Sequence, residues 1–391
     1  MSPFYIWQYP DWPNFRWNTD RIVNLLSEVR LLEGRISGMM SGLGFEIQSR
    51  TSLGVMTEDV IRSNEIEGIF LNADRVRSSV ARQLGIPSEG LPDPDHYTDG
   101  VVQIMIDATR NYTAALTEER LFNWHAALFP SGRSGIHPIT VAHWRVGEAP
   151  MQIVSGAIGK EKVHYEAPAS ADVPQEMTRF LDWINHEKGT DPVLKAAIAH
   201  LWFVAIHPFD DGNGRLTRTI TDMLLARADG MPHRYYSMSG EIQRNKKQYY
   251  EALEKTNARD VDITLWLEWF LQTLRNAIVR SEETISRVVK KSMFWQEHRN
   301  TAMNQRQIKV VNKLWDGFDG KLTSAKWAKI CKTSQPTALR DINDLIRKGI
   351  LAKCEGGSKN SSYILLNDSP RNDADRTADI EAYPESMDDF A

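Results

Sequence analysis

A twelve-residue segment, HPFDDGNGRLTR from His207 to Arg218, limits most strongly what this chain can fold into. The apolar segment that precedes it, Pro192–Ile206, predicts a buried helix. Pro208 disfavours helical geometry at His207, the residue before the proline. Gly212 and Gly214 permit backbone conformations that other residues avoid. A second helix is expected to start at about Gly214. Its first N–H groups lack partners within the helix and point into the loop, so the segment predicts a cradle for a phosphate group.

Four side chains of this segment add chemistry to the cradle. Arg215 and Arg218 are three residues apart on one helical face, so both guanidinium groups can meet one polyphosphate. Asp211 offers a hard carboxylate that suits Mg²⁺ bridging two phosphates. His207, whose ordinary pKa is about 6.5, can accept the proton of an attacking hydroxyl.

Each element alone also has an ordinary structural explanation. A DGNG sequence is a common turn, and a glycine-rich stretch before a helix is more often structural than catalytic. The combination of a base, a carboxylate, two glycines and two phased arginines within twelve residues favours a catalytic site.

The surrounding sequence predicts a mainly α fold. Helical patterns cover Val101–Asn111, Glu118–Phe129, Pro174–Glu187, Pro192–Ile206, Arg215–Ala228 and Lys246–Asn257. The pattern breaks at residues 144–166, where Gln152–Ser155 and Lys162–Tyr165 flank a glycine turn and predict a β-hairpin. Towards the N-terminus, helices are expected over Ile22–Ile36 and Gly44–Asn64, and a long helix is expected over Asp260–Lys291.

The C-terminal sequence predicts a separate basic module. Helices over Arg306–Trp315, Ser324–Lys332 and Gln335–Arg347, followed by strands between Ile350 and Leu366, are in the order of a winged helix-turn-helix. Residues 304–366 contain twelve Lys or Arg and five Asp or Glu, whereas residues 367–391 contain two basic and eight acidic residues. The overall charge of −4 therefore averages a basic module with an acidic tail, which is expected to be disordered.

Composition excludes several other classes of protein. Hydrophobic residues make up 41% of the chain and charged residues 25%, which is ordinary for a globular protein. No apolar run approaches the roughly 18–20 residues that cross a bilayer, and the first residues do not have the pattern of a signal peptide. The two cysteines are too few for a disulfide scaffold or a zinc cluster and favour the cytoplasm.

The segment His207–Arg218 resembles the signature of the Fic family, H-x-F-x-(D/E)-G-N-G-R-x-x-R, and departs from it at no defined position. The resemblance covers about residues 99–275 and implies a helical bundle with a β-hairpin flap over the site. It implies a protein adenylyltransferase, which uses ATP and Mg²⁺ to attach AMP to a Ser, Thr or Tyr hydroxyl of a protein. By the same resemblance His207 is the general base and Asp211 the metal ligand. The implied phosphate-binding residues are Gly212, Asn213, Gly214, Arg215 and Arg218.

The resemblance also extends to two stretches outside the loop. A flap strand that docks the target protein is expected at Gln152, Ile153, Val154, Ser155 and Gly156. The segment YYEALEKTN resembles the family's adenine and ribose contacts, with Tyr249 and Asn257 as candidates; Tyr249 is as well explained as an ordinary aromatic on a helix face. Fic relatives that act as kinases replace the glycines of GNGR, so the intact stretch implies attack at the α-phosphate of ATP.

Residues 63–68, SNEIEG, resemble the family's inhibitory motif, (S/T)-x-x-x-E-(G/N). Ser63 and Glu67 are four residues apart and therefore share one helix face. The resemblance implies that Glu67 pairs with Arg218 and so restrains ATP binding. The alternative is that Glu67 is one acidic residue at an ordinary helix end. In some relatives the equivalent glutamate supports AMP removal, and the sequence leaves that second activity open.

These interpretations divide the chain into five parts: an N-terminal helical domain (1–95) with the inhibitory helix at about 55–68, the Fic catalytic domain (99–275), a helical linker (276–303), the winged helix-turn-helix (304–366) and the acidic tail (367–391). The winged helix predicts DNA binding through Gln335, Thr337 and Arg340, or else protein interaction and dimerisation. A rival hypothesis is a transcriptional regulator whose Fic domain senses nucleotide or modifies the chain itself. The protein target cannot be read from the sequence.

Overall fold

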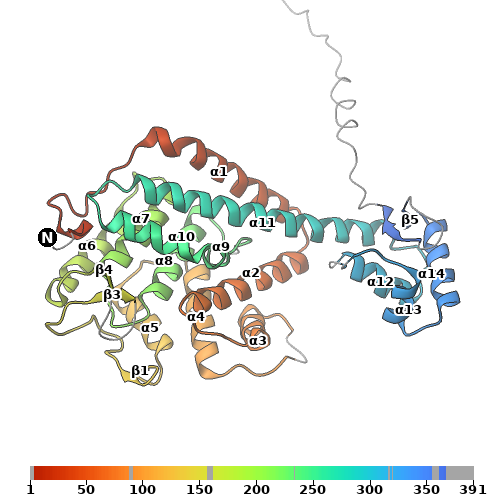
Figure 1. Ribbon diagram of the computed structural model, residues 1–391, viewed down its shortest axis with the longest axis horizontal. Helices are drawn as coiled ribbons and strands as arrows, with labels where there is room; N and C mark the ends of the chain where they lie inside the picture. Colours follow the sequence, from red (N-terminus) through yellow and green to blue (C-terminus); the bar gives the residue numbers. More distant parts are fainter. Residues whose placement is uncertain are drawn as a thin grey trace, which may run out of the picture. The chain divides into compact units, whose positions relative to one another are not determined.

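The computed structural model describes residues 4–87, 91–155, 162–232, 234–315, 318, 320–354 and 361–366 (Figure 1). The expected tail (367–391) and Gly156 of the expected flap lie outside these ranges. The chain divides into two compact units, Met1–Ser286 and Arg287–Ala391, which are described separately. No helix within the described ranges combines the length and apolar character that a bilayer-crossing segment needs.

The first unit opens with helices that precede the loop at His207 in the chain. They are the 3₁₀ helix η1 (Ile6–Gln8) and the α-helices α1 (Thr19–Ser41), α2 (Phe45–Ile66) and α3 (Ala73–Leu84). The side chains of Asn18 and Asn72 accept a hydrogen bond from the first turns of α1 and α3, as N-cap residues commonly do. The sequence analysis did not predict α3, in which the buried Val76 and Val80 are four residues apart.

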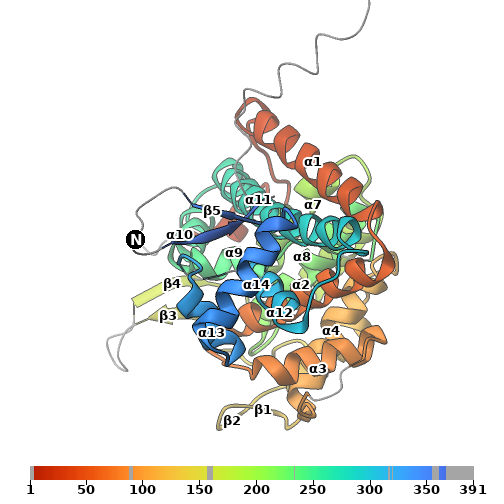
Figure 2. The same ribbon diagram turned by 90° about the vertical axis from the view of Figure 1, so that its right-hand side faces the viewer.

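The next elements surround the loop at His207. They are α4 (His96–Arg110), α5 (Glu118–Leu128), β1 (Arg133–Ser134), β2 (His137–Pro138), β3 (Gln152–Ser155), β4 (Lys162–Glu166), η2 (Ser170–Asp172) and α6 (Val173–His186). Strands β3 and β4 pair antiparallel, which confirms the hairpin expected at residues 144–166. In Figure 2 this hairpin projects from the side of the unit.

The centre of the unit is the pair α7 (Pro192–Ile206) and α8 (Asn213–Asp229), which pack against each other. Helix α7 is apolar on nearly every side, as expected for a helix enclosed by others. Helices α2, α4 and α5 also pack on α8 (Figure 1). The chain continues through α9 (Met238–Arg244), α10 (Lys246–Asn257) and α11 (Thr264–Glu297). The unit is therefore mainly α, as predicted.

The second unit begins within α11 and contains α12 (Gln305–Trp315), α13 (Ser324–Cys331), α14 (Gln335–Arg347), β5 (Leu351–Lys353) and β6 (Tyr363–Leu365). Thr323 and Ser334 cap the N-termini of α13 and α14, and Lys332 adopts the left-handed conformation in the turn between them. Trp327, at the centre of its apolar core, is fully buried. The order of helices and hairpin is the one that the sequence predicts.

Candidate active site

The loop between α7 and α8 begins with a backbone conformation that most residues avoid. His207 has a φ of 51°, in the left-handed region, at the end of α7. Arg145, which is buried, holds this conformation: its Nε donates to the carbonyl of His207 at 2.8 Å, and its backbone N–H donates to the carbonyl of Pro208 at 2.9 Å. The position of the candidate base is thus fixed by a side chain 62 residues earlier in the chain.

The imidazole of His207 is in the correct protonation state for a base. Its pKa is lowered to about 4, chiefly by burial and also by the nearby Arg145, while the hydrogen bond to Val204 and the carboxylates of Glu67 and Asp211 act in the opposite direction. The ring is therefore neutral at pH 7. Since a carbonyl only accepts, the contact of Nδ1 with the Val204 carbonyl at 3.4 Å places the proton on Nδ1. The lone pair of Nε2 is then available to accept a proton.

The N-terminus of α8 lies where the sequence predicts a phosphate cradle. Gly212 has a φ of 82°, and a Cβ there would lie 2.8 Å from Cε2 of Phe129, so both backbone and space require glycine. The side chain of Asn213 spans the loop, since its Oδ1 accepts from Phe209 N–H at 3.0 Å and its Nδ2 donates to the Phe209 carbonyl at 2.8 Å. Any phosphate contact of Asn213 therefore falls to its backbone N–H. The first turn of α8 supplies such groups together with the positive end of the helix dipole.

Both arginines are buried and already engaged. The Nη1 of Arg215 donates to the Tyr97 hydroxyl at 2.8 Å, and its guanidinium lies over the ring of Phe129 at 4.9 Å. The Nε of Arg215 is buried and has no hydrogen-bond partner among the described residues. Arg218 donates to the hydroxyl and the carbonyl of Ser63 at 2.9 and 2.8 Å.

Glu67 follows the last residue of α2 and reaches the same cradle. Its Oε1 lies 2.7 Å from Nη2 of Arg218, so the pair expected from the family resemblance is present. A Cβ on Gly214 would lie 2.2 Å from that same oxygen, which places the carboxylate directly against the first turn of α8. In this arrangement an acidic side chain occupies the position where the helix N-terminus would attract a phosphate.

Asp211 is the one loop carboxylate that matches the expected metal ligand. It retains 44% of its side-chain exposure, accepts the hydroxyl of Ser134 at Oδ2, and accepts the Gly212 N–H at Oδ1 at 2.5 Å. A carboxylate offers about four acceptor positions, so each oxygen keeps one for a cation. No cluster of three or more His, Cys, Asp or Glu occurs within the described ranges. A single carboxylate fits Mg²⁺, which typically takes its other ligands from water and substrate phosphates.

The two nucleotide candidates on α10 have different surroundings. Tyr249 is buried, and its hydroxyl lies 2.9 Å from Nε2 of His200, so in this state it belongs to the core behind Arg218. Asn257 is also buried, but its Oδ1 has no hydrogen-bond partner among the described residues. Asn257 therefore offers a free acceptor, whereas Tyr249 offers chiefly an aromatic edge.

The β3–β4 hairpin is bound to α7 by a hydrogen bond. The hydroxyl of Tyr165 on β4 donates to the carbonyl of Ala205 at 2.7 Å, two residues before His207. Within the described ranges β3 pairs only with β4, so its other edge is free of strand partners. Gln152, Ile153 and Val154 therefore lie on a strand that is able to pair with another chain, and Val154 is 47% exposed.

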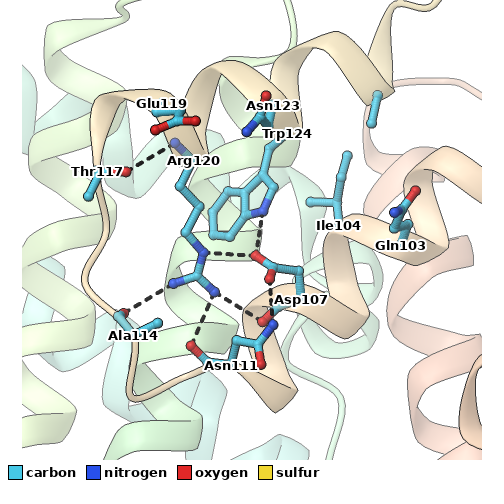
Figure 3. A pocket seen from close by; sticks show the side chains of 11 residues that line it. Gln103, Ile104, Asp107, Asn111, Ala114, Thr117, Glu119, Arg120, Asn123 and Trp124 are labelled. Carbon is cyan, nitrogen blue, oxygen red and sulfur yellow. Dashed lines mark hydrogen bonds and ion pairs between the residues drawn. The ribbon is translucent and has the colours of Figure 1, made fainter.

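A separate hollow of about 460 Å³ lies between α4 and α5 (Figure 3). Arg120 dominates it and donates from Nε to Asp107 at 2.8 Å, and the indole N–H of Trp124 donates to the same carboxylate at 2.8 Å. Arg120 also donates to the carbonyls of Asp107 and Asn111. The charged groups of Arg120 and Asp107 pair with each other and link α4 to α5, so the hollow is not a candidate site.

Sequence reasoning missed several residues of the site. Arg145, Tyr97, Ser134 and His125 contact the loop from other elements, and no local motif marks them. His125 lies in a segment predicted as helix and Arg145 in the predicted hairpin region, whereas Tyr97 and Ser134 lie outside the predicted elements. Their role depends on packing, which spacing along the chain does not show.

Comparison with known proteins agrees with this geometry. Residues 115–225 match the Fic/DOC family, and residues 5–86 match a domain of unknown function, DUF4172. The protein adenylyltransferase Fic of Nematostella vectensis is 24% identical over 208 residues, which cover 52% of this chain and 44% of that protein. The protein of the same name from Drosophila willistoni is 41% identical over 96 residues, which cover 24% of this chain and 18% of the relative.

A solved structure shares the fold. The crystal structure of a Fic family protein from Desulfovibrio desulfuricans covers 89% of this chain and 96% of its own, with 21% identity and a TM-score of 0.51. This likeness shows that the two proteins share a fold. Residues 115–225 form a Fic/DOC domain, which confirms the resemblance seen in the loop. The chain spans less than half the length of the curated relatives described above.

Proposed function

We propose that this protein is a protein adenylyltransferase that moves AMP from ATP to a hydroxyl group of a protein. The observation that carries the proposal is the convergence on one loop of a neutral histidine, a helix N-terminus and two buried arginines. The names of the curated relatives support the same activity. The Ser, Thr or Tyr acceptor and the target protein are not specified by these residues.

The reaction that these groups support is a displacement at the α-phosphate. Nε2 of His207 accepts the proton of the attacking hydroxyl, whose oxygen forms the new bond to phosphorus. The bond between the α-phosphorus and the oxygen that bridges to the β-phosphate breaks, and pyrophosphate leaves. The N–H groups at the start of α8, with Arg215 and Arg218, stabilise the negative charge of the phosphates and the leaving group. Asp211 would hold Mg²⁺, which supplies further neutralisation of phosphate charge when bound.

We further propose that Glu67 restrains the enzyme. Its carboxylate occupies the first turn of α8 and binds Arg218, so a γ-phosphate meets a like charge and an arginine that is already paired. Ser63 takes part because its hydroxyl and carbonyl oxygens accept hydrogen bonds from Nε and Nη2 of Arg218. ATP therefore binds productively only when Glu67 moves away. The same carboxylate leaves AMP removal open as a second activity, which is tested by incubating AMP-modified peptides with the protein that retains Glu67 and measuring loss of the added mass.

The flap strand is the proposed docking place for the target. Main-chain groups on the free edge of β3 pair with an extended segment of the target, and this pairing presents the hydroxyl to His207. The chain itself is a candidate target. A cytoplasmic location remains a prediction based on the cysteine content.

The decisive experiment uses the Glu67→Gly protein with ATP, Mg²⁺ and a cell lysate, followed by mass spectrometry. We expect peptides that carry the added mass of AMP on a hydroxyl residue. The matched Glu67→Gly/His207→Ala protein should give none while remaining folded by circular dichroism. Equal labelling by both proteins would contradict the role of His207, and no labelled peptide with the first protein would contradict adenylyl transfer.

A second candidate function rests on the basic module. Residues 304–366 carry a net charge of +7, and Gln335 and Arg340 are exposed at the start of α14, with Thr337 half-buried between them. This arrangement suits a recognition helix, and we propose DNA binding through it, with homodimerisation as the alternative role. An electrophoretic shift assay at low salt tests the proposal, because phosphate contacts weaken as salt rises. Failure to retard any duplex would favour dimerisation, which light scattering measures.

A further inference from the structure

His125 on α5 is a fully buried histidine for which the proposed reaction has no direct use. Its Nε2 lies 3.1 Å from the carbonyl of Asp211, and its Nδ1 lies 3.1 Å from the backbone N of Ala142. Its ring stacks on Phe209, with centroids 4.2 Å apart and planes 11° from parallel. One imidazole therefore contacts the catalytic loop twice and a second segment once.

These partners determine the tautomer. The backbone N–H of Ala142 only donates, so Nδ1 must be the acceptor. The carbonyl of Asp211 only accepts, so Nε2 must carry the proton. The neutral ring protonated at Nε2 is the only form that makes both hydrogen bonds. The two bonds fix the ring in one orientation, so it is able to act as a rigid connection.

The Asp211 carbonyl belongs to the peptide group at which the cradle begins. The peptide group is planar, so fixing that oxygen also fixes the N–H of Gly212 in the same plane. This N–H donates to Oδ1 of Asp211 at 2.5 Å, and Gly212 then turns with a φ of 82° to start α8. The direction of the first turn of α8 and the position of the Asp211 carboxylate thus both depend on one peptide plane.

Helix α5 is a firm support for this ring. Trp124, the neighbouring residue, is bound to Asp107 of α4, and so is Arg120 (Figure 3). On the other side, Ala142 has a φ of 53° and lies three residues before Arg145, which holds the carbonyl of His207. The bond from Ala142 to His125 therefore also steadies the segment that positions the base.

We propose that His125 is a positioning residue, which sets the Asp211–Gly212 peptide plane and thereby aims the phosphate cradle and the Asp211 carboxylate. The inference rests on the proposed function in that the loop is taken to bind a nucleotide. His125 does not touch the reacting atoms. It acts only through the backbone of the loop.

Two substitutions separate the contacts of the ring. In glutamine the side-chain nitrogen is three bonds from Cβ, as Nε2 is in histidine, so His125→Gln can still donate to the Asp211 carbonyl. In His125→Asn the amide reaches only the position of Nδ1, so that donor is lost. Both changes remove the stacking on Phe209. Ile36→Ala on α1, a buried position outside the loop, serves as a control for loss of stability alone.

The experiment compares these variants in the Glu67→Gly background with three readouts: kcat and KM for ATP, ADP binding by calorimetry, and hydrogen exchange of the peptide that contains residues 207–218. We expect His125→Asn to lower kcat by about 100-fold, the order expected for a misplaced site. It should weaken ADP binding by up to about tenfold, which corresponds to one lost hydrogen bond. His125→Gln should remain within about threefold of its parent in each quantity.

Hydrogen exchange keeps this inference distinct from the proposed activity. If the parent transfers no AMP, the proposed function fails, but faster exchange in the loop of His125→Asn than of His125→Gln would still support the positioning role. Equal effects of the two substitutions, or effects no larger than those of Ile36→Ala at matched thermal stability, would overturn it.

Discussion

Replacing Glu67 tests most directly how this protein is controlled. Glu67→Gly removes the carboxylate that lies against Gly214 and binds Arg218 at 2.7 Å. Glu67→Gln keeps the size of the side chain and a hydrogen-bond acceptor but removes the charge. The two variants therefore separate the electrostatic part of the restraint from the part that comes from occupied space.

The magnitude follows from the burial of the pair. Arg218 is 2% exposed, and Glu67 keeps 31% of its side-chain exposure. A hydrogen bond between charged groups contributes about 1.5–3 kcal/mol, and partial solvent screening at Glu67 favours the lower end, about 1.5–2 kcal/mol. This free energy corresponds to about a 10- to 30-fold change in the population that accepts ATP productively. Glu67→Gln should approach that increase, and Glu67→Gly should exceed it because the space against Gly214 is also vacated.

The assay measures initial rates of labelled AMP incorporation at ATP concentrations well below KM, where a change in productive binding appears in full. Glu65→Gln is the matched control: Glu65 lies on the same helix turn, but its carboxylate pairs with Arg62. We expect that variant to stay within about twofold of the unchanged protein. An increase below about threefold for Glu67→Gly, or an equal increase for Glu65→Gln, would refute this reasoning.

Three further predictions concern the same site. Tyr97→Phe removes the hydroxyl that Arg215 binds at 2.8 Å. If this hydrogen bond helps to restrain the enzyme, the change should raise basal AMP incorporation by about two- to tenfold and have little effect once Glu67→Gly is present. Equal effects in both backgrounds would contradict a role of Tyr97 in restraint. Because burial lowers the pKa of His207 to about 4, AMP incorporation by Glu67→Gly should be level from about pH 5.5 to 8 and should fall only as the pH approaches 4. A half-maximal rate near pH 6.5 would indicate a histidine with an ordinary pKa. Gly214→Ala places a Cβ where the Glu67 carboxylate lies, so it should lower incorporation by about 100-fold even with Glu67→Gly; a fully active double variant would show that the cradle does not use this surface.

The layout of the loop could be predicted because it is local. A proline that ends one helix, two glycines and arginines at a spacing of three are properties of consecutive residues. The structure has both helices, α7 and α8, on either side of that loop. The β3–β4 hairpin was similarly visible from alternating residues around a glycine turn.

Sequence alone gave less information about the inhibitory contact. Helical spacing placed Ser63 and Glu67 on one face, but only the family resemblance paired Glu67 with Arg218. Tyr249 illustrates the limit in another way. It stays a candidate nucleotide contact, but the sequence did not show that the fold buries its hydroxyl against His200, a residue that no motif connects with it.

Tertiary structure alone decided which distant groups hold the site in shape. Arg145 is 62 residues from His207, His125 is 86 from Asp211, Tyr97 is 118 from Arg215, and Glu67 is 151 from Arg218. Spacing within a helix is fixed by the geometry of the helix, so a local motif carries it. Contacts across such separations depend on how several helices pack together, so they follow only from the assembled bundle. The sequence thus specified the candidate reactive groups, and packing decided their orientation and the carboxylate that meets them.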